Sequence, residues 1–146
     1  MVRRQTEPFR WEGVELHPYK EDGGTHFRDI SRQTLLLGTE DFPVELRYFE
    51  MGPGGYSTLE RHGHVHVVTI GRGSGQVLVG DKVTVVSQND VVLVPPRTWH
   101  QFRATDGVPF AFFCVVSSDR DRPERPSESD LAQLRSNPAV AEFVRV

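Results

Sequence analysis

The chain has 146 residues, about the length of one ordinary domain, and 37% of them are apolar and 25% charged, as in a compact folded protein. Its net charge of −3 gives no basic surface for nucleic acid, and no apolar run approaches the ~20 residues that span a bilayer. Neither a nucleic acid nor a membrane is therefore an expected partner. The single cysteine, Cys114, excludes an internal disulfide and a metal site built from cysteines.

Short apolar runs separated by 13 glycines and 10 prolines predict an all-β chain with many turns. Alternating polarity over residues 44–48 is typical of a half-buried strand, and we expect the glycine–proline run at 52–55 to end it. A hairpin is expected around Gly80-Asp81, because this dipeptide suits a tight turn. The strands predicted after the first one cover residues 67–70, 77–79, 83–86, 91–94 and 110–116.

Two short helices are expected at the C-terminal end. Ser127 or Ser129 is suited to cap the first helix, and Asn137-Pro138 is suited to end it and begin the second. The apolar side chains of this segment should pack on the outer surface of the sheet. We therefore predict one domain over residues 1–146, with a small β-barrel or jelly roll at about 44–116 and a helical extension at about 127–146.

Histidines are the first chemically informative feature, because three of the six fall within five residues, His62, His64 and His66. Alternate residues of a straight strand share one face but lie ~6–7 Å apart, which is too far for three of them to hold one ion. The chain must therefore turn near residues 63–65, or leave one histidine outside the site. A further ligand is expected from His100, which follows a buried strand and the Pro95-Pro96 turn.

These two segments resemble the two motifs of the cupin family. The first motif, G-x5-H-x-H-x3,4-E-x6-G, falls on Gly54, Glu60, His62, His66 and Gly73, with Glu60 in place of a His and His66 in place of the Glu. The second, G-x5-P-x-G-x2-H-x3-N, falls on Asn89, Pro95, Arg97, His100 and Ala104, with only the Pro and the His retained. The resemblance implies a small single-domain cupin with a jelly-roll barrel.

The exchange of the motif's acid for His66 resembles small cupins whose metal is held by four histidines. That resemblance implies His62, His64, His66 and His100 as the ligands, and it is the interpretation that we prefer. An alignment without gaps leaves His64 spare and makes Glu60 a possible fourth ligand. Imidazole ligands favour one divalent transition ion (Mn, Fe, Ni, Cu or Zn) over Mg or Ca, which prefer oxygen donors.

The resemblance also implies a range of functions, among which the fold alone cannot choose. The leading hypothesis is a metal-dependent enzyme with an oxygenase-type, dioxygenase-like reaction on a small organic substrate. The alternative is a cupin that binds or senses a small molecule without chemistry. A homodimer is expected, with residues 34–37 as a strand that two copies could exchange. No secretory signal is visible, so the cytoplasm is the expected location.

Other residues are assigned bland roles. His17 and His26 lie outside the motifs in polar surroundings and are expected on the surface or in loops. Cys114 lies in an apolar strand and is expected to be a small core residue rather than a nucleophile. The aromatic side chains of the second half should be mostly core, with one or two lining a pocket.

Overall fold

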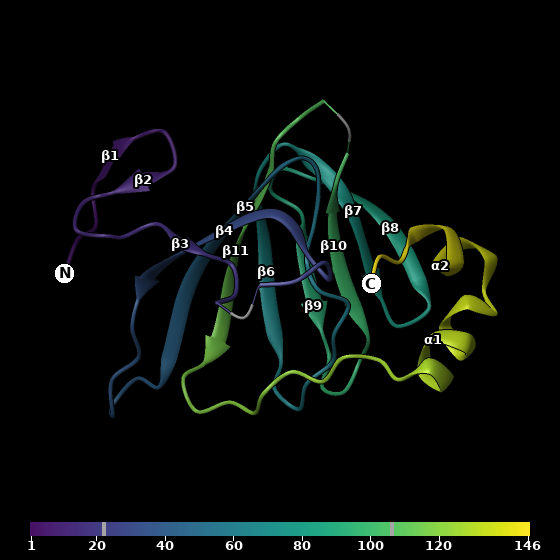
Figure 1. Ribbon diagram of the computed structural model, residues 1–146. Helices are drawn as coiled ribbons and strands as arrows, with labels where there is room; N and C mark the ends of the chain where they lie inside the picture. The colour runs from purple at the N-terminus through teal and green to yellow at the C-terminus, as the bar shows by residue number, and fades with distance from the viewer. Residues whose placement is uncertain (22, 106) are drawn as a thin grey trace.

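The structure is a computed structural model that describes residues 1–21, 23–105 and 107–146 (Figure 1). Strands make up most of its regular structure, and two short helices follow them. The strands are β1 (Gln5–Glu7), β2 (Arg10–Trp11), β3 (His17–Pro18), β4 (Arg28–Leu36), β5 (Val44–Tyr56), β6 (His66–Arg72), β7 (Ser74–Val79), β8 (Lys82–Ser87), β9 (Val91–Val94), β10 (His100–Ala104) and β11 (Phe110–Ser117). The helices are α1 (Glu128–Arg135) and α2 (Pro138–Phe143).

The strands from β3 to β11 form one antiparallel sheet that curls into a half-barrel (Figure 1). Its order is β8-β7-β10-β5-β11-β6-β9, with β4 added to β5 and β3 added to β4. Because successive side chains point to opposite faces of a strand, each strand sends every second side chain into the lumen. The predicted all-β class, a cupin-type jelly-roll barrel with a C-terminal helical segment, is confirmed. None of the helices among the described residues has the length and apolar character to cross a bilayer.

β5 is longer than predicted, because the glycine–proline run at 52–55 continues the strand instead of ending it. β4 pairs along β5 as far as Tyr56, with a register shift between Arg28 and Ile30. At that shift the Asp29 carboxylate folds against Gly52, where a Cβ would lie only 1.9 Å from Oδ2. Gly52 therefore permits the close approach of a neighbouring strand. In the sequence, a glycine with this role looks the same as a glycine that ends a strand. β4 also includes most of the segment 34–37, which pairs here with β5 of the same chain.

The predicted hairpin turn and helix caps are confirmed. Val79 and Lys82 are partners across the predicted hairpin, and Gly80 has a φ of 69°, which a residue without a Cβ adopts easily. Ser127 caps α1 with a full capping box to Asp130. Asn137 caps α2, where Pro138 occupies the first turn.

The sheet has apolar layers on both faces. Inside the barrel the buried cluster includes Phe49, Phe102 and Phe112.

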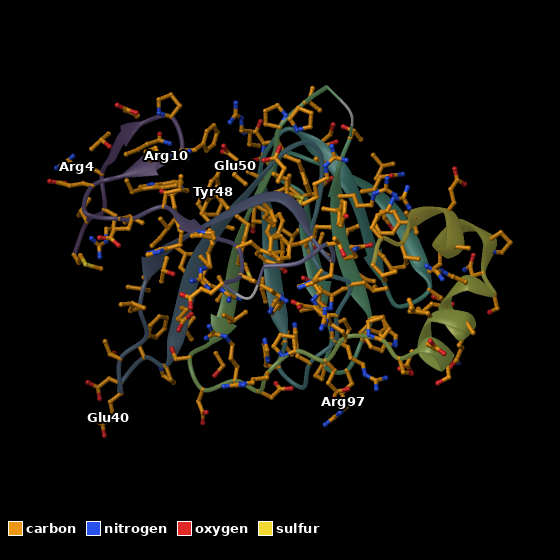
Figure 2. All side chains as sticks on the ribbon, in the orientation of Figure 1. Arg4, Arg10, Glu40, Tyr48, Glu50 and Arg97 are labelled. Atoms are coloured by element: carbon orange, nitrogen blue, oxygen red, sulfur yellow. The ribbon has the colours of Figure 1, made fainter. Side chains whose placement is uncertain are left out.

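On the outside, Val140 and Phe143 of α2 pack with Leu59 and Leu78, as predicted for the helical segment. The β1–β2 ribbon lies beside another part of the outer face, near Tyr48 of β5 (Figure 2). Phe9 and Trp11 contact the Tyr48 ring.

Gln101 of β10 attaches the C-terminal tail to the barrel next to a predicted metal ligand. Its fully buried amide donates to the carbonyls of Ser57 (2.7 Å) and Arg145 (2.8 Å) and accepts from the Arg145 amide (2.9 Å). Gln101→Met should lower the free energy of unfolding by about 2–3 kcal/mol, because it leaves buried peptide groups unpaired. Urea denaturation measures this change. Gln133→Met, on the exposed side of α1, is the control, and equal midpoints for the two variants would contradict the role of Gln101.

Candidate metal centre

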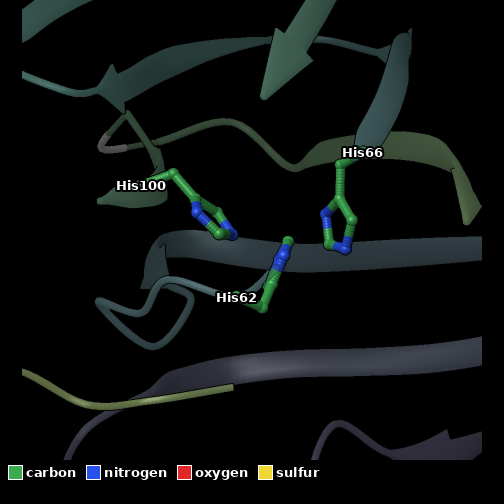
Figure 3. A group of neighbouring side chains, drawn as sticks. All are labelled: His62, His66 and His100. Carbon is green, nitrogen blue, oxygen red and sulfur yellow. The ribbon is translucent and has the colours of Figure 1, made fainter. Parts of the chain in front are cut away.

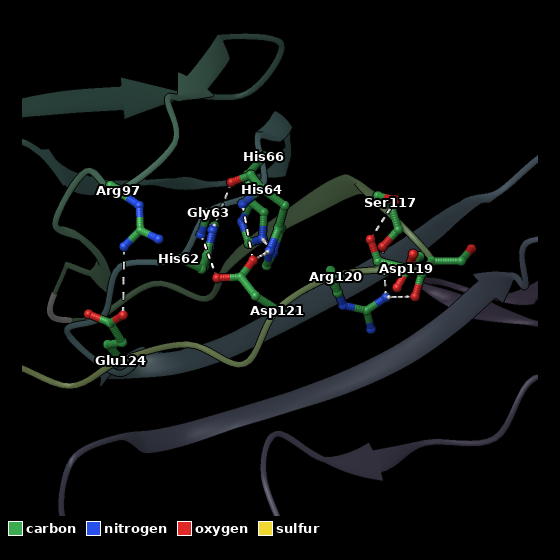
Figure 4. Close-up of polar contacts among 11 residues, drawn as sticks. His62, Gly63, His64, His66, Arg97, Ser117, Asp119, Arg120, Asp121 and Glu124 are labelled. Atoms are coloured by element: carbon green, nitrogen blue, oxygen red, sulfur yellow. Dashed lines mark hydrogen bonds and ion pairs between the residues drawn. The ribbon is translucent and has the colours of Figure 1, made fainter.

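The chain turns between residues 62 and 66, which is one of the two outcomes that the histidine spacing allowed. After an isolated bridge between Glu60 and His100, it leaves the sheet and rejoins it at His66, the first residue of β6. The Asp121 carboxylate holds this turn, accepting from the amides of Gly63 (2.6 Å) and His64 (3.2 Å) (Figure 4). The turn brings side chains that would be spread along a straight strand towards one point.

Three of the predicted ligands converge inside the barrel mouth. His62, His66 and His100 each offer a ring nitrogen within 4.8 Å of the others (Figure 3). The ring of His62 is centred 4.3 Å from that of His66 and 4.8 Å from that of His100. Two separate parts of the chain, the 62–66 turn and the start of β10, therefore contribute to one cluster of imidazoles.

His64 lies beside this cluster. Its ring stacks on that of His62, with centroids 3.7 Å apart, and its Nε2 lies 3.2 Å from Nε2 of His66. Two imidazole nitrogens that bind one ion at about 2.1 Å, with tetrahedral or octahedral angles, lie about 3.0–3.4 Å apart. The Nε2 separation of His64 and His66 is thus compatible with a shared ion, although His64 is not part of the group of three.

Hydrogen bonds at the far side of the rings determine which nitrogen faces the cluster. Nδ1 of His62 donates to the carbonyl of His64 (2.8 Å), and Nδ1 of His100 donates to the carbonyl of Thr98 (3.0 Å). Nδ1 of His64 faces Oδ1 of Asp121 at 2.8 Å. A neutral ring that donates through Nδ1 carries its lone pair on Nε2. Nε2 of His62 is also buried without a hydrogen-bond partner among the described residues, so this donor set fits a cation.

Glu60, the other candidate ligand, is engaged elsewhere. It is buried in the same wall, and its Oε2 accepts a hydrogen bond from Nζ of Lys20 at 2.5 Å. This ion pair neutralises the carboxylate without a metal. Glu60 thus has a charged partner of its own in the wall that it shares with the three converging histidines.

Burial keeps the imidazoles of His62, His66 and His100 uncharged at neutral pH by lowering the pKa of each. Desolvation, followed by the charges of His100 and His64, lowers the pKa of His62 to about 4. Desolvation is also the main cause that lowers the pKa of His66 and of His100. The pKa of Asp121 is lowered by its hydrogen bonds from Gly63 and His64, so that carboxylate stays ionised. Neutral imidazoles are the form that binds metal ions.

The lowered pKa values predict that the metal-free protein loses stability in mild acid. Below about pH 6.5 the unfolded chain protonates these histidines while the folded chain resists protonation, in the case of His62 down to about pH 4, so folding becomes less favourable as the pH falls. Each histidine should contribute up to about 1.4 kcal/mol per pH unit to the slope. Urea denaturation of chelator-treated protein at several pH values measures it. His62→Asn should flatten the slope, and an already flat wild-type profile would contradict the prediction.

The imidazole cluster opens into a cavity of about 210 Å³ inside the barrel. Phe49, Phe102 and Phe112 form an apolar part of its wall, and Cys114 of β11 lies in the same wall. Cys114 is buried, as predicted for a core residue, but the sequence-based preference for packing over a nucleophilic role did not foresee that it also lines this cavity. Nη2 of Arg47 lies 3.6 Å from its sulfur. Burial raises the pKa of the thiol, whereas the Arg47 charge opposes that change.

Sequence reasoning missed several residues around this centre. Asp121 lies between β11 and α1, in a stretch for which the sequence predicts neither a strand nor a helix, and only its contact with His64, 57 residues back along the chain, reveals its role. Lys20 and Arg47 likewise carry no motif. His26, expected on the surface, is instead buried, with Nδ1 2.9 Å from Oγ1 of Thr58, because the loop before β4 folds against the barrel. His17 is exposed, as expected.

Comparisons with known proteins agree with this architecture. The family described as "Cupin domain" matches residues 47–116. The chain is 49% identical over 136 residues to the 1-methylthio-D-xylulose 5-phosphate methylsulfurylase of Rhodospirillum rubrum. The match covers 93% of this chain and 86% of that protein. A crystal structure of a cupin 2 conserved barrel domain protein from Rhodopseudomonas palustris has a TM-score of 0.93 and 51% identity, with both chains fully covered.

A second crystal structure, a cupin-2 domain protein from Rhodospirillum rubrum, has a TM-score of 0.87 and 47% identity, and the match covers 97% of this chain and 95% of that one. The residues that the family model matches contain both motif segments and the strands between them. The chain belongs to the cupin family.

Proposed function

We propose that His62, His64, His66 and His100 hold one divalent transition ion, Mn, Fe, Ni, Cu or Zn, at the mouth of the barrel. The buried Nε2 of His62, which has no other partner in the described part of the chain, supports this, as do the three rings that donate through Nδ1. Asp121 would orient His64 from behind, as carboxylates commonly do for metal-bound histidines.

We infer that the protein is an enzyme that removes the methylthio group from a methylthio-substituted ketose phosphate. The 49% identical relative is named for such a substrate. The observation that carries the inference is that the imidazole cluster and the Cys114 thiol line one cavity of about 210 Å³. In such a substrate the ketone oxygen and the thioether sulfur are separated by only two carbons. An enzyme that acts on both atoms therefore needs a group for the oxygen and a group for the sulfur in one small site, and the imidazole cluster and the thiol are two such groups.

A bound divalent ion would polarise the ketone of the substrate and stabilise negative charge on its oxygen. The Cys114 sulfur attacks the thioether sulfur, so that a sulfur–sulfur bond forms and the carbon–sulfur bond breaks. The electron pair of the broken bond passes into the enolate of the ketose. The proton lost by the thiol is then returned to the carbon that carried the methylthio group. Arg47 stabilises the negative sulfur before attack, because its guanidinium lies 3.6 Å away.

This chemistry leaves a methyl disulfide on Cys114 and a 1-deoxy ketose phosphate as product. A second thiol, from solution, must then attack the methyl-bearing sulfur, so that it leaves with the methylthio group as a mixed disulfide and Cys114 is released as a thiol. The thiol must come from solution because the sequence contains no second cysteine. The cavity wall of Phe49, Phe102 and Phe112 would exclude water from the apolar methylthio group.

The test is incubation of the metal-loaded protein with 1-methylthio-D-xylulose 5-phosphate and a thiol, with the products followed by NMR. The expected result is a 1-deoxy ketose phosphate, formed at the same rate with and without oxygen. Oxygen consumption matched to substrate loss would instead establish the oxygenase-type reaction, which four protein ligands on a six-coordinate ion also permit. Recovery of unchanged substrate from a tight complex would establish a binding or sensing protein.

A homodimer remains a prediction for this chain. Light scattering during size-exclusion chromatography measures the mass directly, and the mass of one chain would contradict the prediction.

A further inference from the structure

The cavity carries more positive charge than its own carboxylates neutralise. Four cationic side chains line it, and these are Lys20, Arg32, Arg47 and Arg120. Glu60 pairs with Lys20 at 2.5 Å, and Glu45 pairs with Arg120 at 2.9 Å. Asp121, the other acid in the wall, is held by the 62–66 turn. No carboxylate in the described part of the chain forms an ion pair with Arg32 or Arg47.

The register of the sheet places these two arginines side by side. Arg32 of β4 is opposite Phe49 of β5, and Thr34 of β4 is opposite Arg47 of β5. Arg32 and Arg47 are therefore diagonal neighbours on the face of the sheet that points into the lumen, within reach of one another for long side chains. In both, the Nε atom is buried and has no hydrogen-bond partner among the described residues.

Two neighbouring guanidinium groups with buried, unsatisfied donors are unfavourable unless something shares their charge. Like charges repel, and a buried N–H without an acceptor costs about 1–3 kcal/mol. A divalent ion at the histidines would add further positive charge to the same cavity. An anionic ligand with several oxygens removes these costs together, and guanidinium groups bind phosphate oxygens with matching geometry.

We propose that Arg32, together with Nε of Arg47, forms an anion subsite that binds the phosphate group of the substrate. The binding of phosphate follows from the charges and the register alone, whereas its assignment to a ketose phosphate rests on the proposed function. Arg47 uses Nη2 towards Cys114, so its Nε remains for the anion and Arg32 is the principal ligand. Arg32 thus determines specificity for phosphorylated over unphosphorylated substrates.

The first test uses inorganic phosphate and does not depend on any reaction. Phosphate should raise the melting temperature of the metal-loaded protein above that in chloride of equal ionic strength. Arg32→Met should weaken phosphate binding about 10- to 100-fold, and Arg32→Lys should weaken it less. The control is Arg28→Met, an exposed arginine on the same strand, which should bind phosphate like the wild type.

An absence of any phosphate effect on the wild type would overturn the proposal. So would equal phosphate binding by folded Arg32→Met and Arg28→Met, because phosphate would then bind at the metal or elsewhere. If Arg32→Met does not fold, the wild-type comparison and Arg32→Lys still decide the question. Metal content, measured for each variant, shows whether the histidine site is intact.

The second test assigns the anion to the substrate. The ratio of kcat/KM for 1-methylthio-D-xylulose 5-phosphate to that for its unphosphorylated form should fall about 10- to 100-fold in Arg32→Met, with most of the change in KM. An unchanged ratio would overturn the assignment. Failure of the wild type to turn over either compound would instead reject the proposed function and leave the anion subsite to be judged by phosphate binding.

Discussion

Replacement of His100 by glutamine should remove the metal from the purified protein. His100 is the one member of the cluster from β10, it is almost completely buried, and its hydrogen bond to the Thr98 carbonyl directs Nε2 towards the other rings. Loss of a residue that only hydrogen-bonds a metal ligand already weakens metal affinity about 10- to 100-fold. Loss of a ligand itself should therefore weaken metal affinity at least about 100-fold. Elemental analysis should then give close to no metal per chain, and turnover should fall with it.

Two further variants make this result specific. His17→Gln, at an exposed histidine of β3, should retain the full metal content and activity. His64→Gln distinguishes a site of three ligands from a site of four. If His64 is a fourth ligand, its loss should weaken metal affinity about as much as the loss of His100. If His64 is only a neighbouring ring, its loss should weaken metal affinity little. Full metal content in folded His100→Gln would reject the centre altogether.

Cys114→Ser should abolish turnover of the methylthio ketose phosphate while the metal stays bound. The hydroxyl is a much poorer nucleophile towards sulfur than a thiolate, and no other thiol is present in the chain, so we expect a loss of about 1,000-fold or more in kcat. Stopped-time assays with metal content measured in parallel test this. In the wild type, mass spectrometry of the protein without added thiol should show one methylthio group attached to Cys114.

Cys114→Ala is the matched companion, because it keeps the site apolar and avoids burying a hydroxyl in a mostly apolar wall. Both variants should have the circular dichroism spectrum and metal content of the wild type. Turnover by either variant near the wild-type rate would show that Cys114 is only a packing residue and would remove the proposed mechanism, although not the metal site.

Local signals in the sequence determined much of this protein. Alternating and β-branched segments gave the strands, Gly80-Asp81 gave the hairpin, and Ser127 and Asn137 gave the helix caps, because these features depend on backbone conformation within a few residues. The spacing of His62, His66 and His100 identified the two segments that meet. Local signals failed at the run 52–55, where glycine serves the approach of Asp29 rather than a turn, and at His26, whose polar neighbours suggested exposure although the side chain is buried.

Only the tertiary structure decided what surrounds the histidines. Three contacts around the site join residues that are 40 to 67 positions apart in the sequence. They are the hydrogen bonds of Asp121 to the 62–66 turn, the ion pair of Lys20 with Glu60, and the contact of Arg47 with Cys114. No periodicity connects such residues, because their proximity follows from strand order and register, and these depend on how the whole sheet curls. The sequence alone was sufficient to predict the fold and the two histidine segments that meet. The charge of the cavity and the position of its thiol required the folded chain, because electrostatic and covalent chemistry depend on distances that only packing sets.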